Sequence, residues 1–358
     1  MNQSPSPIPA VPPFRAAHYR WIICALLFFA TTINHMDRAV LGVLAPALRA
    51  EIGWTDQEYG YINAGFTLAF GPVKTIQEAI EAVQWHRVEP VEIFIKAGEY
   101  DGIVRVPRER PNLRFIGEDR KRVIITALNN ERLHPNSGWP ARSAFVVEAD
   151  DVVIENLTIR NTTPKGGSQA EALYVNGQRC IIRDCDFYSF QDTLNLSGRV
   201  YVENCYIEGD VDFAWGYGSV VFKDCELKAV RDGCYVQSRN AAGVHGMVFV
   251  DCTLSAAPAT RKCRLGRIEL DRFPGSEVAF IRCRMGSHIP PAGWIVTGEG
   301  RRDQLRFVEF GSTDLEGMPI DVSEMSHPNF CLPEVWIRPP QTPGFLAAFS
   351  THPKPFPS

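Results

Sequence analysis

The 358-residue sequence predicts an all-β protein whose main domain is a parallel β-helix. A short pattern that ends near a cysteine recurs along the chain, and its copies begin about twenty to thirty residues apart, which is the spacing of a solenoid repeat. No helical periodicity lies between the copies, so the coils are expected to stack their apolar interiors on one another. The copies are IIRDCDF at 181–187, VYVENCYI at 200–207, VVFKDCEL at 220–227, MVFVDCTL at 247–254 and VAFIRCRM at 278–285.

Residues 1–70 do not share this repeat. After a Pro-rich start, an apolar run extends over thirteen residues from Trp21 to Ile33, fewer than the roughly twenty that span a bilayer as a helix. Asp37 and Arg38 follow, and a helix that continued to Leu48 would bury both charges. We expect one transmembrane-like N-terminal helix that associates with a membrane through residues 21–48. A cleaved signal peptide and a soluble amphipathic helix are the alternatives.

Residues 18–70 resemble the first transmembrane helix and the following loop of major facilitator superfamily transporters. The stretch INHMDRAVLGVLAP at 33–46 resembles the sugar-acid and anion symporter branch in particular. This resemblance implies a membrane segment of transporter origin. Transport itself is not expected, because one hydrophobic segment has no second bundle with which to enclose a substrate path.

The repeat places two aspartates in the same phase. Asp192 and Asp212 each follow a cysteine by seven residues, and those cysteines, Cys185 and Cys205, are twenty residues apart. On stacked coils such residues lie about 4.8 Å apart, the spacing between strands. Two carboxylates this close do not ionise independently, so one is expected to act as an acid and the other as a base. The structural alternative is that both are turn residues, and Asp232 has the same phase relative to the next cysteine.

Motifs around these aspartates resemble those of pectin methylesterases over residues 71–332. They are KTIQEAIEAV at 74–83, SQAEAL at 168–173, FQDTL at 190–194, GDVDFAWG at 209–216, LGR at 265–267 and MGSHIPPAGW at 285–294. The resemblance implies a single-stranded, right-handed parallel β-helix. It also implies removal of methyl groups from methyl-esterified polygalacturonate to give pectate and methanol, with no metal and no cofactor.

The resemblance assigns roles to five residues. Asp212 would be the nucleophile that attacks the ester carbonyl, and Asp192 the general acid that becomes a base in the second half of the reaction. Gln169 and Gln191 would donate hydrogen bonds to the oxyanion of the transition state. Arg267 would bind Asp212 through its fork of donors and hold it as a carboxylate.

Three aromatic residues near the motifs, Phe190, Trp215 and Trp294, either present flat faces to sugar rings or pack in the interior. We expect them to bind substrate, Trp294 on the strength of the resemblance. The sequence departs from the commoner family pattern where LGR is followed by Ile268 and Glu269, and where QDTL is followed by Asn195. The sugar subsites are therefore expected to differ from the usual ones.

Composition supports the remaining expectations. The formal net charge of −4 gives no basis for nucleic-acid binding. None of the ten cysteines forms a CxxC pair, and the five in the repeat share one position, so we expect buried, mostly reduced thiols in an interior ladder. Residues 333–358 form a Pro-rich C-terminal tail.

We expect a monomeric enzyme, membrane-associated or exported to the cell envelope, that acts on pectin. The competing interpretations are a β-helix that binds pectin without turnover and a membrane protein of transporter origin. Within catalysis, an enzyme that cleaves the polygalacturonate backbone is the weaker alternative.

Overall fold

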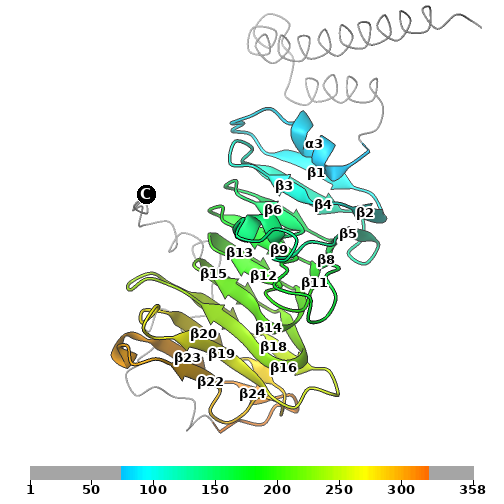
Figure 1. Ribbon diagram of the computed structural model, residues 1–358. Helices are drawn as coiled ribbons and strands as arrows, with labels where there is room; N and C mark the ends of the chain where they lie inside the picture. The colour runs from blue at the N-terminus through cyan, green and yellow to red at the C-terminus, as the bar shows by residue number, and fades with distance from the viewer. Residues whose placement is uncertain (1–73, 322–358) are drawn as a thin grey trace, which may run out of the picture. The chain divides into compact units, whose positions relative to one another are not determined.

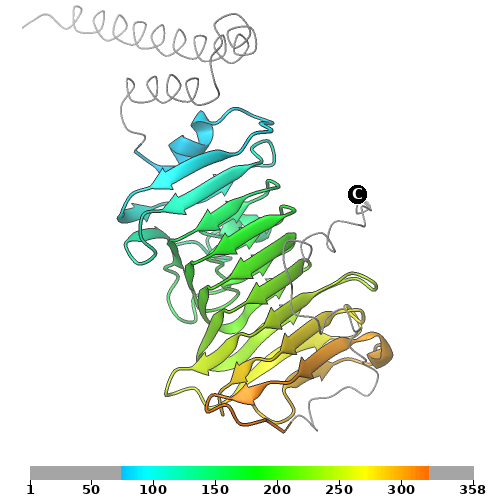
Figure 2. The same ribbon diagram turned by 180° about the vertical axis from the view of Figure 1, so that it is seen from behind.

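The computed structural model describes residues 74–321, and these residues form the predicted parallel β-helix (Figure 1). Its strands stack coil upon coil, as the view from behind also shows (Figure 2). The predicted N-terminal helix of residues 21–48 and the Pro-rich tail lie outside the described residues. Within residues 74–321, no helix is long and apolar enough to cross a membrane.

One wall of the coils is a parallel sheet of nine strands, and its pairing follows the chain order coil by coil. Its strands are β1 (Val91–Ile95), β4 (Leu113–Gly117), β7 (Val153–Glu155), β10 (Cys180–Arg183), β13 (Arg199–Glu203), β15 (Ser219–Lys223), β17 (Met247–Val250), β20 (Glu277–Ile281) and β23 (Arg306–Phe310).

The remaining strands form a second sheet, in which two walls meet at the long strands β14 (Tyr206–Gly216) and β16 (Glu226–Ser238). Its other strands before β14 are β2 (Gly98–Asp101), β3 (Val104–Val106), β5 (Val123–Ala127), β6 (Phe145–Val147), β8 (Thr158–Asn161), β9 (Leu173–Val175), β11 (Asp186–Tyr188) and β12 (Leu194–Leu196). Those after β16 are β18 (Thr253–Ala256), β19 (Cys263–Glu269), β21 (Arg284–Met285), β22 (Trp294–Thr297) and β24 (Thr313–Asp314).

Three short helical segments complete the described structure: α3 (Ile76–Ala82), η1 (Trp139–Arg142) and η2 (Arg302–Gln304). Helix α3 begins at a capping box, in which Thr75 and Glu78 bond each other's backbone N–H groups. Its buried residues Ile76 and Ile80 join the hydrophobic core at the first coil.

Each copy of the sequence repeat spans two strands of its coil. In IIRDCDF, the residues before Asp184 belong to β10 and those after Cys185 to β11. Asp184 adopts a φ of 56°, and this left-handed residue ends the first strand. Residues of equal phase in other coils share the conformation, with φ of 49° at Asn204, 52° at Asp224 and 56° at Asp251. Asn and Asp tolerate it better than other residues that carry a Cβ, which explains why they recur before the cysteine.

The cysteine after each of these turns faces the interior, as predicted. Cys185, Cys205, Cys225, Cys252 and Cys283 are buried, and the eight cysteines within the described residues are free thiols. Each ladder thiol donates to the carbonyl oxygen two residues before it, for example Cys185 Sγ to Arg183 O at 3.1 Å.

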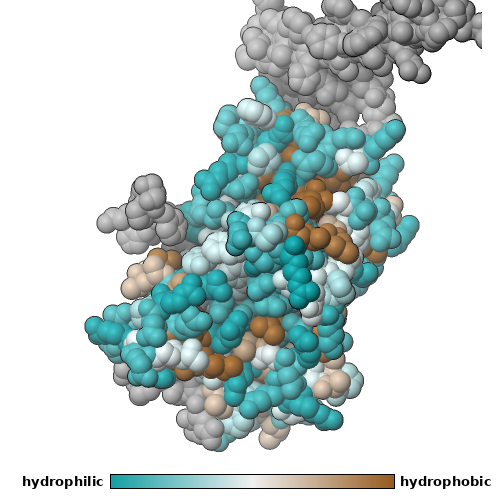
Figure 3. All heavy atoms as spheres, in the orientation of Figure 1, coloured by the Kyte–Doolittle hydropathy of each residue, from teal (hydrophilic) through white to brown (hydrophobic). Residues whose placement is uncertain are grey.

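Aromatic rings stack along the same interior. The rings of Phe222 and Phe249 are nearly parallel, with their centroids 4.4 Å apart, and Phe280 continues the stack at 4.6 Å from Phe249. With apolar groups inside the coils, the face of the described residues seen in Figure 3 is mainly hydrophilic with separate hydrophobic patches.

Candidate active site

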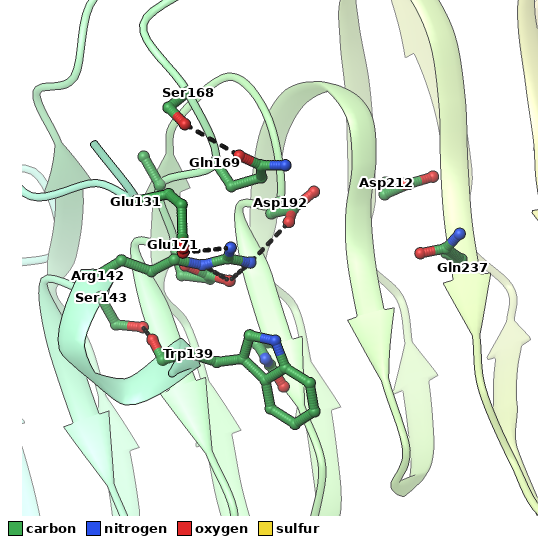
Figure 4. A network of polar contacts seen from close by, with 12 residues as sticks. Glu131, Trp139, Arg142, Ser143, Ser168, Gln169, Glu171, Asp192, Asp212 and Gln237 are labelled. Atoms are coloured by element: carbon green, nitrogen blue, oxygen red, sulfur yellow. Dashed lines mark hydrogen bonds and ion pairs between the residues drawn. The ribbon is translucent and has the colours of Figure 1, made fainter. Parts of the chain in front are cut away.

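Asp192 and Asp212 occupy equivalent positions on adjacent coils, as their spacing predicted. Gln191 bridges Val211 in parallel, and two residues beyond Asp192 the strand β12 pairs Leu194 with Ala214 of β14. The Asp192 N–H also donates to Val211 O at 3.0 Å. Both aspartates have left-handed backbone, with φ of 67° at Asp192 and 52° at Asp212, and both lie in the close view of the site (Figure 4).

Asp212 is held by the arginine that the resemblance assigned to it. Arg267, on β19, places Nε at 2.9 and 3.0 Å from the two carboxylate oxygens of Asp212, and one of its Nη groups also donates to Oδ2. The hydrogen bond to Asp212 is the main cause that raises the pKa of Arg267. Asp212 is only 2% exposed, so this two-point contact fixes the direction of its carboxylate in a site of low dielectric.

Asp192 has a different set of partners, which the sequence did not reveal. Arg142, at the end of η1, donates from Nη2 to Asp192 Oδ2 at 2.9 Å (Figure 4). The same guanidinium binds Glu171 through Nε at 2.9 and 3.0 Å and through Nη2 at 2.7 Å. Its Nη1 reaches the more exposed Glu131 at 3.1 Å. Asp192 therefore belongs to a buried group of two carboxylates around one cation.

Burial dominates the protonation of this group. It raises the pKa of Asp192 well above its usual range, and the carboxylates of Glu171 and Asp212 act in the same direction, against Arg142 and Arg239. Burial also raises the pKa of Glu171 to about 7, which Arg142 partly opposes. A guanidinium at 2.9 Å favours an ionised aspartate, but desolvation and two like charges outweigh it, so we take the net direction at Asp192 to be upward.

The predicted amide donors lie at this site. Gln169 is half-buried, and its Oε1 accepts from Ser168 Oγ at 2.9 Å, so its Nε2 is the end left to donate (Figure 4). Gln191 adjoins Asp192 in the chain, and its half-buried side chain comes from the same turn. A third amide, Gln237, pairs with Trp215 in the sheet register and was not predicted.

Two of the three aromatic residues that were predicted to bind sugar rings are buried in this structure. Trp294 is 8% exposed and packs against Phe280 and Phe307 in the core. Trp215 is 1% exposed, because Trp139 packs edge-on against it and Arg239 lies 4.6 Å above its ring. Both faces are covered by protein, so these two expectations are corrected. Phe190 is half-buried.

Other aromatic residues, which the sequence reasoning missed, lie next to the site at the surface. Trp139 stacks on Tyr217 at 5.2 Å with an interplanar angle of 27°, and Tyr217 meets Phe273 edge-on at 6.1 Å. All three are half-buried. Arg239, bonded to Gln237 Oε1 at 3.0 Å, lies over Phe273 as well as Trp215. This group offers apolar faces and a cation beside the two aspartates.

The site is thus built for acid and nucleophile chemistry by two carboxylates in different surroundings. Asp212 is bound at two points by a guanidinium, whereas Asp192 is buried among like charges that favour its neutral form. Among residues 74–321, no three His, Cys, Asp or Glu side chains gather in a way that could hold a metal ion.

Comparison with known proteins places the fold and the motifs in one family. The pectinesterase family model matches residues 68–317. The chain is 31% identical over 270 residues to the probable pectinesterase/pectinesterase inhibitor 64 of Arabidopsis thaliana, covering 67% of this chain and 43% of that protein. It is 29% identical to pectinesterase 2 of Olea europaea, covering 68% and 67%.

Solved structures of pectin methylesterases share the fold of this chain. Pectin methylesterase from carrot superimposes with a TM-score of 0.63 at 26% identity, covering 72% of this chain and 85% of that one. Pectin methylesterase from Yersinia enterocolitica, at 24% identity, shares the fold with a TM-score of 0.60, over 72% and 98% of the two chains. The chain spans between 43% and 67% of the length of the two curated relatives above. On the family match over residues 68–317, the chain belongs to the pectinesterase family.

Proposed function

We propose that this protein is a carboxylic ester hydrolase that removes methyl groups from methyl-esterified polygalacturonate, giving pectate and methanol. The observation that carries the proposal is the pair of carboxylates on adjacent coils, one bound by Arg267 and the other buried beside Glu171. Family membership supports the same chemistry.

In the first half of the reaction, an oxygen of Asp212 attacks the carbonyl carbon of the methyl ester. The electron pair of the carbonyl moves onto its oxygen, and the amides of Gln169 and Gln191 donate to that oxyanion. When the oxyanion collapses, the bond to the methoxy oxygen breaks, and the proton of Asp192 passes to that oxygen. Methanol leaves, and an acyl anhydride joins the substrate to Asp212.

In the second half, Asp192 is a carboxylate and takes a proton from a water molecule. The resulting hydroxide attacks the acyl carbon, and the bond to Asp212 breaks. This releases the galacturonate product as a carboxylic acid, which gives its proton to the solvent, and it restores Asp212 as an anion and Asp192 as an acid. The raised pKa of Asp192 suits this cycle, because the group must be protonated when the ester binds.

Methanol release from methylated pectin tests the proposal on the full chain. The expected result is stoichiometric release of methanol and new carboxylates, with no loss of polymer viscosity. Unmethylated polygalacturonate is the control and should yield none. Binding without methanol would indicate a non-catalytic pectin-binding β-helix, and loss of viscosity without methanol would indicate backbone cleavage; either result would overturn the esterase assignment.

We further propose that the protein is a monomer of the cell envelope or exterior that associates with membranes through residues 21–48. The apolar run from Trp21 to Ile33 supports the membrane association. Flotation on a density gradient with liposomes checks it: the full chain is expected to float, and a chain that begins at Gly71 is expected to stay in the dense fraction. Equal partitioning of the two would contradict membrane association.

A further inference from the structure

The Arg142 and Glu171 pair is a feature that the proposed mechanism does not use. Both side chains are buried: Glu171 is fully inaccessible and Arg142 is 6% exposed. Arg142 lies in η1, fifty residues before Asp192 in the chain, and its guanidinium contacts both Glu171 and Asp192. Glu171 lies just before β9, whose Leu173 pairs with Leu194, so it shares the wall of the coil with Asp192.

An arginine beside a general acid creates an electrostatic problem. A cation in contact with a carboxyl group stabilises its anion and would make Asp192 give up its proton before substrate arrives. The guanidinium nevertheless supplies a directional N–H donor at 2.9 Å, which orients the carboxyl group. A second carboxylate on the same guanidinium resolves the conflict once it is ionised, above a pH of about 7, because it then neutralises the cation and keeps the orienting contact.

We infer that Arg142 and Glu171 act as a positioning pair, in which Arg142 aims Asp192 and Glu171 offsets the charge of Arg142 so that Asp192 keeps its proton. This inference rests on the proposed esterase function. The proposed mechanism gives neither residue a contact with the substrate, so both act through Asp192.

The groups around Asp192 show why Glu171 matters. The cations are Arg142 and Arg239, with Arg267 more distant on Asp212, and the anions are Glu171 and Asp212. Glu131, which also binds Arg142, is one-third exposed and is screened by water. Without Glu171, Arg142 would retain only this weak partner and Asp192. The balance at Asp192 would then shift toward the anion.

The contacts of Arg142 link Glu171 directly to Asp192. Arg142 Nη2 donates to both Glu171 Oε1 at 2.7 Å and Asp192 Oδ2 at 2.9 Å, so one nitrogen couples the two carboxyl groups. Burial raises the pKa of both carboxyl groups, and protons on the coupled pair therefore come off in linked steps.

The test is the pH dependence of kcat/KM for methanol release by the full chain carrying Glu171→Gln. The amide keeps the shape and removes the charge. We expect the alkaline limb, which reports loss of the proton from Asp192, to move to lower pH by about one unit or more. The double variant Arg142→Met/Glu171→Gln removes the cation too, so its limb is expected to lie at higher pH than that of the single variant. Its kcat is expected to fall about tenfold or more, because Asp192 is no longer aimed.

Asp251→Asn is the matched control, because it neutralises a carboxylate that pairs with Arg282 at the turn of another coil. Its pH profile should superimpose on that of the parent. If the parent is active and the Glu171→Gln limb does not move, the inference is overturned. If Glu171→Gln does not fold, the double variant is measured against the parent. The inference is overturned if the alkaline limb of the pH profile and the kcat of the double variant are both the same as those of the parent. A parent that releases no methanol overturns the proposed function instead.

Discussion

Replacing Asp212 by asparagine is expected to lower kcat for methanol release by about 10⁴-fold or more, the scale seen when a residue of a catalytic unit is removed. The amide of asparagine is not a nucleophile, so the anhydride cannot form. The fold is expected to remain intact, because asparagine accepts the φ of 52° that Asp212 requires. Steady-state methanol release and a thermal melt of the variant would measure the two effects separately.

The matched control for this change is Asp224→Asn. Asp224 has the same φ of 52° but lies at a turn that carries no part of the site. It should keep nearly all activity. Methanol release by Asp212→Asn at the rate of the parent would show that another group is the nucleophile.

Replacing Asp192 by asparagine is expected to lower kcat by about 10²- to 10⁴-fold, the usual worth of general acid and base catalysis. The reason differs from that for Asp212, since the nucleophile remains. An ester with a good leaving group, such as an aryl ester, needs no proton on departure and should still acylate the variant. Hydrolysis of the anhydride would remain slow, because no base activates the water.

The expected observation for Asp192→Asn is therefore a burst of one leaving group per enzyme, followed by a slow phase. The parent should show sustained turnover on the same ester, and Asp212→Asn should show no burst. Steady turnover of the aryl ester by Asp192→Asn at the rate of the parent would contradict a role for Asp192 in the second half of the reaction.

The sequence predicted the stack of coils and the meeting of Asp192 with Asp212 because both follow from a fixed spacing of twenty residues. The same spacing also pointed to Asp232, and there it misleads. Between β14 and β16 the register shifts at Gly209 and Val211, so the next coil is longer. Asp232 lies in the added residues, fully exposed, and caps the backbone of Arg261 and Lys262. Residues at the same distance from the repeat cysteine stack on one another only where neighbouring coils have equal length.

Contacts made by residues outside the recurring pattern could not be read from the repeat. Arg142 lies in η1, outside the recurring pattern, and nothing in its neighbours indicates that it reaches Glu171 and Asp192. Arg267 was assigned to Asp212 from the family motif, not from spacing, and the structure confirms that contact. The assigned catalytic roles of these residues remain predictions.

The prediction that Trp215 and Trp294 bind sugar rings was wrong for a different reason. Strand alternation predicts which face a side chain takes, but Phe213, Ala214 and Trp215 are all buried in β14. The strand bends where two walls join, and at such a bend both faces are covered by protein. Exposure there depends on the neighbouring loops, which bring Trp139 over Trp215.

The left-handed backbone at both aspartates limits which amino acids their positions accept. Asparagine fits there as well as aspartate, and the two are related by one nucleotide in the codon. A single point mutation at Asp212 would therefore preserve the backbone architecture while ending turnover. Selection for folding alone would not detect the loss, so within this scaffold an enzyme and an inert sugar-holding protein are neighbouring genotypes.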